Sequence, residues 1–246
     1  MKVFNADLHI HTVLSPCGSL EMSPKAIVLA AIDKKLDIIG ITDHNSTRQC
    51  RIVADEAKKA NLTCYCGAEV TTREEVHCLA FFENFEKLDL FQQFLEINLP
   101  DIENNPDLFG YQVVVNEVEE IVYEEPKLLI AALKQGIEQI EQEVHRLNGI
   151  FIPAHVNRSK YSLISQLGFI PPDMKFDALE LSKHMDTETF LKAWPYLKEA
   201  TFLRSSDAHQ PEFIGESFTR LKMKNTDFSE FRMALRKEGG REVIRL

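Results

Sequence analysis

The chain has 246 residues, 44% hydrophobic and 27% charged, which is enough apolar material for the core of one α/β domain. Its net charge of -10 disfavours non-specific nucleic-acid binding, although bound cations could still admit a short nucleic-acid end. The five cysteines form neither a disulfide framework nor a zinc finger, and no signal-peptide or membrane-spanning stretch is visible. We therefore expect a cytoplasmic protein that does not contact a membrane.

Short apolar runs, typical of buried strands, alternate with amphipathic segments along the chain. Expected strands cover residues 3–8, 36–42, 62–68, 76–82, 150–154, 178–181 and 202–205. Ser23-Pro24 is an N-cap and first-turn signal for a helix to about residue 35. Further helices are expected over 48–60, 86–98 and 127–147, the last ending at Asn148-Gly149. This alternation predicts a largely parallel sheet, closed into a barrel.

One segment interrupts the alternation. Residues 100–126 are acidic and contain two strand-like runs, 111–115 and 120–123. We predict an inserted hairpin or flap within a single domain that spans residues 1–246.

Polar side chains gather at the ends of the expected strands, the face of a barrel where catalytic groups collect. His9 and His11 are two residues apart, so both imidazoles point to the same side of a strand. Another apolar run leads directly into Asp43 and His44, and the next ends in Glu69. A buried carboxylate at such a position is costly unless it binds a cation.

The later strands repeat this arrangement. His77 lies inside an apolar run, His155 follows Ala154, and Asp207 and His209 are again two residues apart. Each feature alone has an ordinary structural explanation, but a metal site explains them together. The nitrogen and oxygen ligands suit zinc, manganese or iron, so we predict a centre of two to three divalent ions.

The ordered motifs resemble the PHP (polymerase and histidinol phosphatase) family. They are His9-Ile10-His11-Thr12 with Ser15, Thr42-Asp43-His44-Asn45, Glu69 with His77, Ala154-His155-Val156-Asn157-Arg158, and Ser206-Asp207-Ala208-His209. The resemblance extends from Asp7 to His209. It implies an α/β fold, a distorted (β/α)7 TIM-like barrel.

The resemblance also implies a distribution of ligands among the metals. The first metal would be held by His9, His11, Glu69 and Asp207. The second would share Glu69 and add His77 and His155. The third would use His44 and His209 with one ligand from the loop after His11.

This chain departs from the family pattern in that loop, where Pro16 stands in place of the acidic residue that many relatives carry. Cys17 could supply the missing ligand as a thiolate, or Glu21 could reach back. Alternatively, Cys17 is a small loop residue and the third site is weak. We expect Cys17 to be the ligand.

Three residues are candidates for roles in catalysis. The planar guanidinium of Arg158 suits a bidentate phosphate contact, although a surface salt bridge would also explain the residue. Asp43, His44 or a metal-bound water could protonate the leaving group. Glu180, Lys183 and His184 are weaker candidates, for orienting a ligand and lining the entrance.

We predict a phosphoesterase that hydrolyses a small phosphate ester through a metal-bridging hydroxide. Its substrate would be a nucleotide, an oligonucleotide end, or a sugar or amino-alcohol phosphate. One alternative is an amidohydrolase-type C–N hydrolase, although Glu69 stands where those enzymes use a lysine. Another is a non-catalytic metal-binding module, which the near-complete ligand set disfavours. The oligomeric state is left open.

Overall fold

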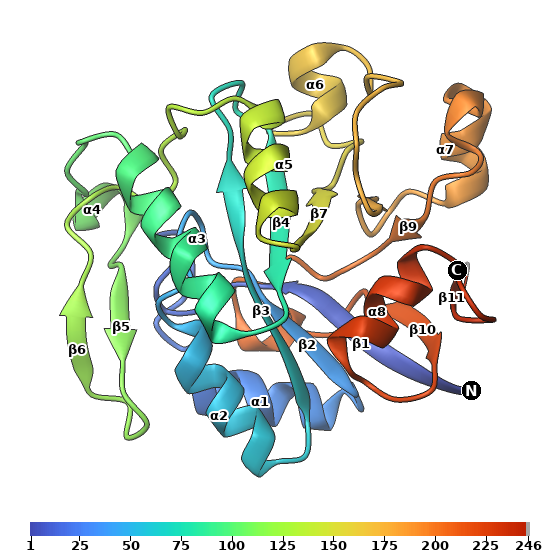
Figure 1. Ribbon diagram of the computed structural model, residues 1–246. Coiled ribbons are helices and arrows are strands. Elements are labelled where there is room, and N and C mark those ends of the chain that lie inside the picture. Colours follow the sequence, from blue (N-terminus) through green and yellow to red (C-terminus); the bar gives the residue numbers. More distant parts are fainter. Residues whose placement is uncertain (245–246) are drawn as a thin grey trace.

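The computed structural model describes residues 1–244, and a curled seven-stranded sheet forms its centre (Figure 1). Its strand order is β11-β10-β1-β2-β3-β4-β7. These strands are β1 (Lys2–Ile10), β2 (Ile38–Ile41), β3 (Thr63–Thr71), β4 (His77–Phe82), β7 (Ile150–Pro153), β10 (Thr219–Met223) and β11 (Glu242–Ile244). The sheet and its helices form a mixed α/β fold, and the expected distorted barrel is confirmed.

The barrel closes through irregular pairing. β8 (Leu179–Glu180) and β9 (Phe202–Leu203) form a short parallel pair, and the Val156 N–H donates to the carbonyl of Glu180 at 2.8 Å. Beyond β9, a bridge joins Ala208 to Ile10 at the end of β1. The chain that follows β9 therefore brings its polar residues against the end of β1.

The expectation of a largely parallel sheet is wrong. Only β1–β2 and β2–β3 pair in parallel within the large sheet, whereas β3–β4, β4–β7, β1–β10 and β10–β11 are antiparallel. The turn between β3 and β4 explains one of these pairings. A parallel crossover needs about a dozen residues, and residues 72–76 can make only a tight turn, closed by a Thr72 N–H to Val76 O hydrogen bond of 2.9 Å.

Three expected helices are present: α1 (Pro24–Asp33), α2 (Cys50–Lys59) and α3 (Phe85–Asn98). The Ser23 side chain caps α1 by accepting from the Ala26 N–H at 3.3 Å. Asn84 caps α3 in the same way. The last three helices of the chain are α6 (Leu163–Leu167), α7 (Thr187–Ala193) and α8 (Phe228–Leu235), with 3-10 turns at Pro195–Leu197 and Pro211–Phe213.

The prediction of a helix over residues 127–147 is wrong for the first half of that range, because α5 covers only Ile137–Arg146. Gly136 has extended backbone at the N-cap, and the Ile137 N–H donates to Glu74 at 3.0 Å. The preceding segment uses its backbone elsewhere, since the carbonyls of Leu129 and Ala131 accept from the Asn45 side chain. The apolar spacing of 127–136 therefore reflects burial without helical structure.

The segment 100–126 contains the expected hairpin, formed by β5 (Val113–Val115) and β6 (Ile121–Glu124), preceded by the short helix α4 (Pro106–Phe109). The hairpin lies outside the sheet and its layer of helices (Figure 1). β5 is buried against the body of the protein, whereas β6 is exposed along its whole length.

Two apolar clusters cover the two faces of the sheet. One contains the buried residues of α1, α2, α3 and α5, and the other includes α8, where Phe231 stacks on Tyr65 with ring centroids 4.9 Å apart. Side chains alternate along a strand, so Glu69 points to the same side of β3 as Tyr65. The interior therefore carries α8 at one end and Glu69 at the other.

Candidate metal centre

The predicted ligands meet at one end of the barrel although they come from distant parts of the chain. His9 lies in β1, with His11 just beyond it, and Glu69 lies in β3. His77 begins β4, His155 follows β7, and Asp207 and His209 follow β9. Apart from His209 and Asp207, which are partly exposed, these side chains are buried.

Glu69 lies at the centre of this cluster. Its carboxylate oxygens are within 3.4 Å of ring nitrogens of five histidines: His77 (2.9 Å), His44 (3.1 Å), His9 (3.2 Å), His155 (3.2 Å) and His11 (3.4 Å). The Nε2 atoms of His9 and His11 also face each other at 3.2 Å. Hydrogen bonds do not satisfy all of these nitrogens. Nδ1 of His44 is buried 3.1 Å from Glu69 but makes no hydrogen bond, and Nδ1 of His155 is buried without a hydrogen-bond partner among residues 1–244.

Divalent cations fit this donor set. Nitrogen and carboxylate-oxygen atoms that approach within 4.8 Å form three groups. The groups are His9, His11, Glu69 and Asp207; His44, Glu69 and His77; and His11, His44 and His209. The first is the set that the family resemblance implies for the first metal, and the other two overlap with the sets implied for the second and third. The ligand roles remain predictions.

The charges within the centre also favour the binding of cations. Burial opposes ionisation of Glu69 and Asp207, yet the surrounding imidazoles hold the pKa of both carboxylates well below the usual range. Burial lowers the pKa of His11, but hydrogen bonds to Asp207 and Glu69 outweigh it and raise the value to about 9. Without metal, protons on histidine compensate the carboxylates, and metal binding would displace them.

The backbone is strained at two of these residues. His155 has a φ of 29° and Asp207 a φ of 55°, in the left-handed region that residues other than glycine rarely adopt. Such strain of about 1–3 kcal/mol is retained where surrounding contacts enforce it, commonly at functional sites. The backbone at both positions is therefore shaped to aim a side chain into the centre.

Further residues hold the ligands in place. Glu180, a weak candidate from the sequence, accepts from His9 Nδ1 at 3.1 Å and from the His155 N–H at 3.0 Å. Ser15, whose role sequence analysis missed, contacts His11 Nδ1 at 2.9 Å and donates to Asp43 at 2.7 Å. The sequence signal that could have indicated this role is the position of Ser15, four residues after His11.

Asp43 is completely buried behind this serine. Its oxygens accept from the Thr12 N–H, the Thr12 hydroxyl and the Ser15 hydroxyl, each at 2.7 Å. Burial raises the pKa of Asp43 above its usual value. This geometry favours a positioning role for Asp43 over proton transfer to a leaving group.

Cys17 contacts a residue of the third ligand group, and Glu21 has no described contact with that group. The Cys17 sulfur is 3.0 Å from His209 Nε2, whereas Glu21 is exposed and its one described hydrogen bond runs from its backbone N–H to Ser19. Partial desolvation and the negative charge of Glu69 raise the pKa of the Cys17 thiol to about 12. The thiol would therefore ionise only with a cation beside it.

Arg158 lies at the entrance, where its guanidinium pairs with Asp207 Oδ2 at 2.5 Å while the side chain stays 43% exposed. Lys183 and His184 are both exposed, and Lys183 pairs with Glu216 at 2.9 Å. Tyr161, which sequence analysis missed, stacks on His77 with centroids 4.8 Å apart. Its 45% exposure leaves part of the side chain accessible beside the centre.

Comparison with known proteins identifies the family of this chain. A family model described as PHP domain matches residues 7–180, and another described as PHP-associated matches residues 200–239. The chain belongs to the PHP domain family. The predicted family is thus confirmed, and membership supports a metal-dependent hydrolase.

The chain is 24% identical over 275 residues to the uncharacterized protein YqxK of Bacillus subtilis, covering 99% of this chain and 65% of that protein. Its fold is similar to that of the lesion-specific endonuclease PfuEndoQ of Pyrococcus furiosus, with a TM-score of 0.73 and 23% identity. That match covers 98% of this chain and 58% of the endonuclease. This PHP chain thus spans about 58–65% of the length of these relatives.

A structure of Endonuclease Q contains a 27-mer duplex substrate with an abasic lesion at the active site. The chain is also similar to a two-domain protein from Bacteroides vulgatus that contains a predicted PHP-like metal-dependent phosphoesterase, with a TM-score of 0.56 and 18% identity. That match covers 95% of this chain and 62% of the other. Within residues 1–244, no helix is both long and apolar enough to cross a membrane.

Proposed function

We propose that this PHP protein is a phosphoesterase that hydrolyses a small phosphate ester at the metal centre. The observation that carries the proposal is the contact of the buried Glu69 carboxylate with five imidazoles. Divalent ions bound there would supply an activated water and neutralise charge on a phosphoryl group. A nucleotide, an oligonucleotide end and a sugar or amino-alcohol phosphate are the candidate substrates.

The protein side chains would bind and orient this substrate. Arg158 is half-exposed at the entrance and in contact with Asp207, so its remaining donors can reach a phosphate oxygen beside the centre. The exposed part of the Tyr161 side chain could pack against a flat group next to that phosphate. His209 is partly exposed. Its pKa is nevertheless lowered to about 4, mainly because the imidazole is largely desolvated and also because of the positive charge of His11.

Hydrolysis of a C–N bond is the second candidate, because the same ligands activate water for amide cleavage. The residue that contacts five of the predicted ligands is the carboxylate Glu69, whereas amidohydrolase-type C–N hydrolases use a lysine in this role. This carboxylate-centred arrangement favours phosphoester hydrolysis.

The test is hydrolysis of p-nitrophenyl phosphate and bis(p-nitrophenyl) phosphate by protein reconstituted separately with manganese, zinc and iron. We expect metal-dependent release of p-nitrophenol that chelator abolishes. We also expect His9→Ala and Asp207→Ala to lose both metal and activity, while Glu86→Gln, exposed on α3 and outside the ligand motifs, retains both. Retained activity in either ligand variant would contradict the site, and cleavage of an anilide but neither ester would favour C–N hydrolysis.

A further inference from the structure

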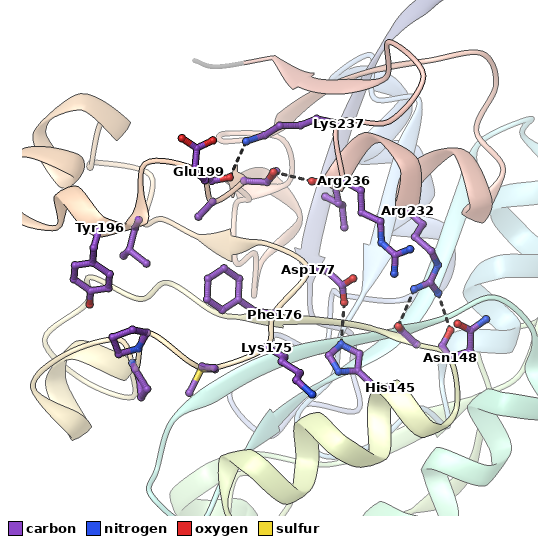
Figure 2. Close-up of a pocket in the computed structure, with 18 residues that line it drawn as sticks. His145, Asn148, Lys175, Phe176, Asp177, Tyr196, Glu199, Arg232, Arg236 and Lys237 are labelled. Atoms are coloured by element: carbon purple, nitrogen blue, oxygen red, sulfur yellow. Dashed lines mark hydrogen bonds and ion pairs between the residues drawn. The ribbon is translucent and has the colours of Figure 1, made fainter.

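A cavity lies at the opposite end of the barrel from the metal centre. It has a volume of about 830 Å³ and is lined by Asn148 and Gly149 just before β7, Asp177 just before β8, and Thr201 just before β9. The metal-centre residues follow the other ends of these strands. The C-terminal turn of α8 forms a further wall (Figure 2).

The cavity is locally basic within an acidic chain. Four cationic side chains line it, Lys175, Arg232, Arg236 and Lys237, against the two carboxylates of Asp177 and Glu199. The local excess of positive charge contrasts with the net charge of -10 for the whole chain. An anion entering this cavity would therefore meet a favourable local field.

Internal contacts occupy two of the cations and one carboxylate. Arg232 donates to the carbonyls of Asn148 and Gly149, and Lys237 donates to the carbonyl of Glu199. Asp177 accepts from His145 Nε2 at 3.2 Å and from the Phe151 N–H at 2.9 Å. These groups build the cavity wall.

Lys175 and Arg236 are the two cations of the cavity that these internal contacts do not involve. Within the described part of the chain, neither side chain has a hydrogen-bond or ion-pair partner. Arg236 is one helical turn from Arg232, and like charges at that spacing destabilise a helix. Burial and this neighbouring positive charge lower the pKa of Arg232. An anion bound by Arg236 would offset the repulsion.

The other side of the cavity is apolar and partly aromatic. Figure 2 shows Phe176 and Tyr196 on the side away from Arg232. Met174, Pro171 and Pro172 also line the cavity. The Tyr196 hydroxyl is already used, donating to the carbonyl of Ile170 at 2.7 Å. The ring surface therefore remains for packing.

We propose that this cavity binds a small molecule in which a flat apolar body carries an oxyanion group, with Arg236 and Lys175 as the anion-binding residues. Phosphate and carboxylate share this chemistry. The guanidinium offers paired donors that match either group, and concave sites with an apolar wall and few polar groups are typical for small ligands. The site is separate from the metal centre and does not depend on the proposed hydrolysis.

The test is calorimetric titration of the chelator-treated protein with phenylphosphonate, which cannot be hydrolysed as an ester, and with benzoate. Chelation removes metal-dependent binding, and the variants of the two cavity cations show whether the remaining binding occurs in the cavity. We expect Arg236→Ala to weaken binding about tenfold, the loss expected for one charge-assisted hydrogen bond. Lys175→Ala should weaken it in the same direction.

Arg220→Ala is the matched control, because Arg220 is exposed on β10 and does not line the cavity. It should bind both probes as the wild type does. Methylphosphonate should bind more weakly than phenylphosphonate because it lacks the flat body. The relative affinity of phenylphosphonate and benzoate identifies the preferred anion. Binding unchanged in both Arg236→Ala and Lys175→Ala, or no binding of either aromatic anion, would overturn the proposal, and thermal melts of each variant establish that it is folded.

Discussion

The Glu180 carboxylate lies behind the predicted ligands and contacts two of them, through His9 Nδ1 and the His155 backbone N–H. Burial raises its pKa, but the neighbouring His9 outweighs burial and lowers the value below its usual range, so the group is an anion. A carboxylate on the remote nitrogen fixes both the tautomer and the direction of a ligating imidazole. Glu180 is therefore a positioning residue for the centre.

Glu180→Gln is expected to lower metal affinity by about 10–100-fold, the usual effect of losing such a partner. The amide keeps the size of the side chain but removes its charge, so the secondary structure should be unchanged. Competition with a chromophoric chelator measures the affinity, with Glu86→Gln on α3 as a surface control. Equal affinity in the wild type and Glu180→Gln would show that His9 is oriented without this carboxylate.

Metal stoichiometry can show whether Cys17 or Glu21 is the loop ligand of the third metal. We expect Cys17→Ala to bind one metal ion fewer per chain than the wild type, because its sulfur is 3.0 Å from His209 Nε2. Glu21→Gln should bind the full number. Cobalt-loaded wild type should also show a sulfur-to-cobalt charge-transfer band that Cys17→Ala lacks. If only Glu21→Gln loses an ion, the loop ligand is the carboxylate instead.

Among the elements, α5 is connected to the segment before β8 by a partly buried ion pair. His145 on α5 contacts Glu141 at 2.6 Å on its own helix and Asp177 at 3.2 Å before β8. The hydrogen bond to Asp177 is the main cause that raises the pKa of His145. Burial raises the pKa of Asp177, but His145 outweighs burial and lowers it, with Arg232 also contributing.

This pair predicts a pH dependence of stability. A raised histidine pKa stabilises the fold below about pH 6.5 and loses that effect as pH rises through the folded value. A lowered aspartate pKa stabilises above about pH 4 and loses that effect as pH falls through the folded value. The stability difference between wild type and His145→Asn should therefore be largest at about pH 4–6.5.

Urea denaturation at about pH 5.5 and pH 9 measures the difference, for metal-depleted protein so that the metal centre does not contribute. His184→Asn is the matched control, because His184 is exposed and has no described ion pair. A wild-type advantage that is the same at both pH values would show that the imidazole contributes through packing alone. The effect is small, since His145 is partly exposed to solvent.

On the scale of the whole molecule, the metal centre joins segments from β1 to the chain beyond β9. Bound ions would cross-link these segments in the folded state, whereas the unfolded chain holds the ligands far apart. Binding to the folded state alone raises the free energy of unfolding by mass action. Stability should therefore depend on metal concentration.

We expect manganese or zinc at about 100 times its dissociation constant to raise the melting temperature by about 5 °C or more. Chelator should reverse the shift, which differential scanning calorimetry measures. Asp207→Ala should show no shift, because the loss of this ligand is expected to abolish metal loading. An equal shift in the wild type and this variant would mean that the ions stabilise the protein from another position.

Much of the centre could be predicted from local patterns in the sequence. Residues two apart on a strand share a face, and this spacing alone pairs His9 with His11 and Asp207 with His209 as ligand candidates. Capping signals likewise located the start of α1 at Ser23-Pro24. These features are local, because they depend on backbone geometry over a few residues.

Strand direction could be predicted only in part. The interval between the runs 62–68 and 76–82 was too short for a crossover, so their antiparallel pairing was available from the sequence. The partners of β10 and β11 were not, because those strands were not expected and they pair with β1 and with each other. Pairing over such sequence separations depends on which edges remain free after the rest has folded.

The sequence by itself determined the family, the barrel class and the candidate metal ligands. Only the tertiary structure decided that 127–136 is not helical, that Glu180 orients His9, and that Lys175 and Arg236 face one cavity. The physical reason is the same in each case. Periodicity and spacing describe the preferences of neighbouring residues, whereas a buried polar group or a cavity depends on the partners that distant segments bring to it.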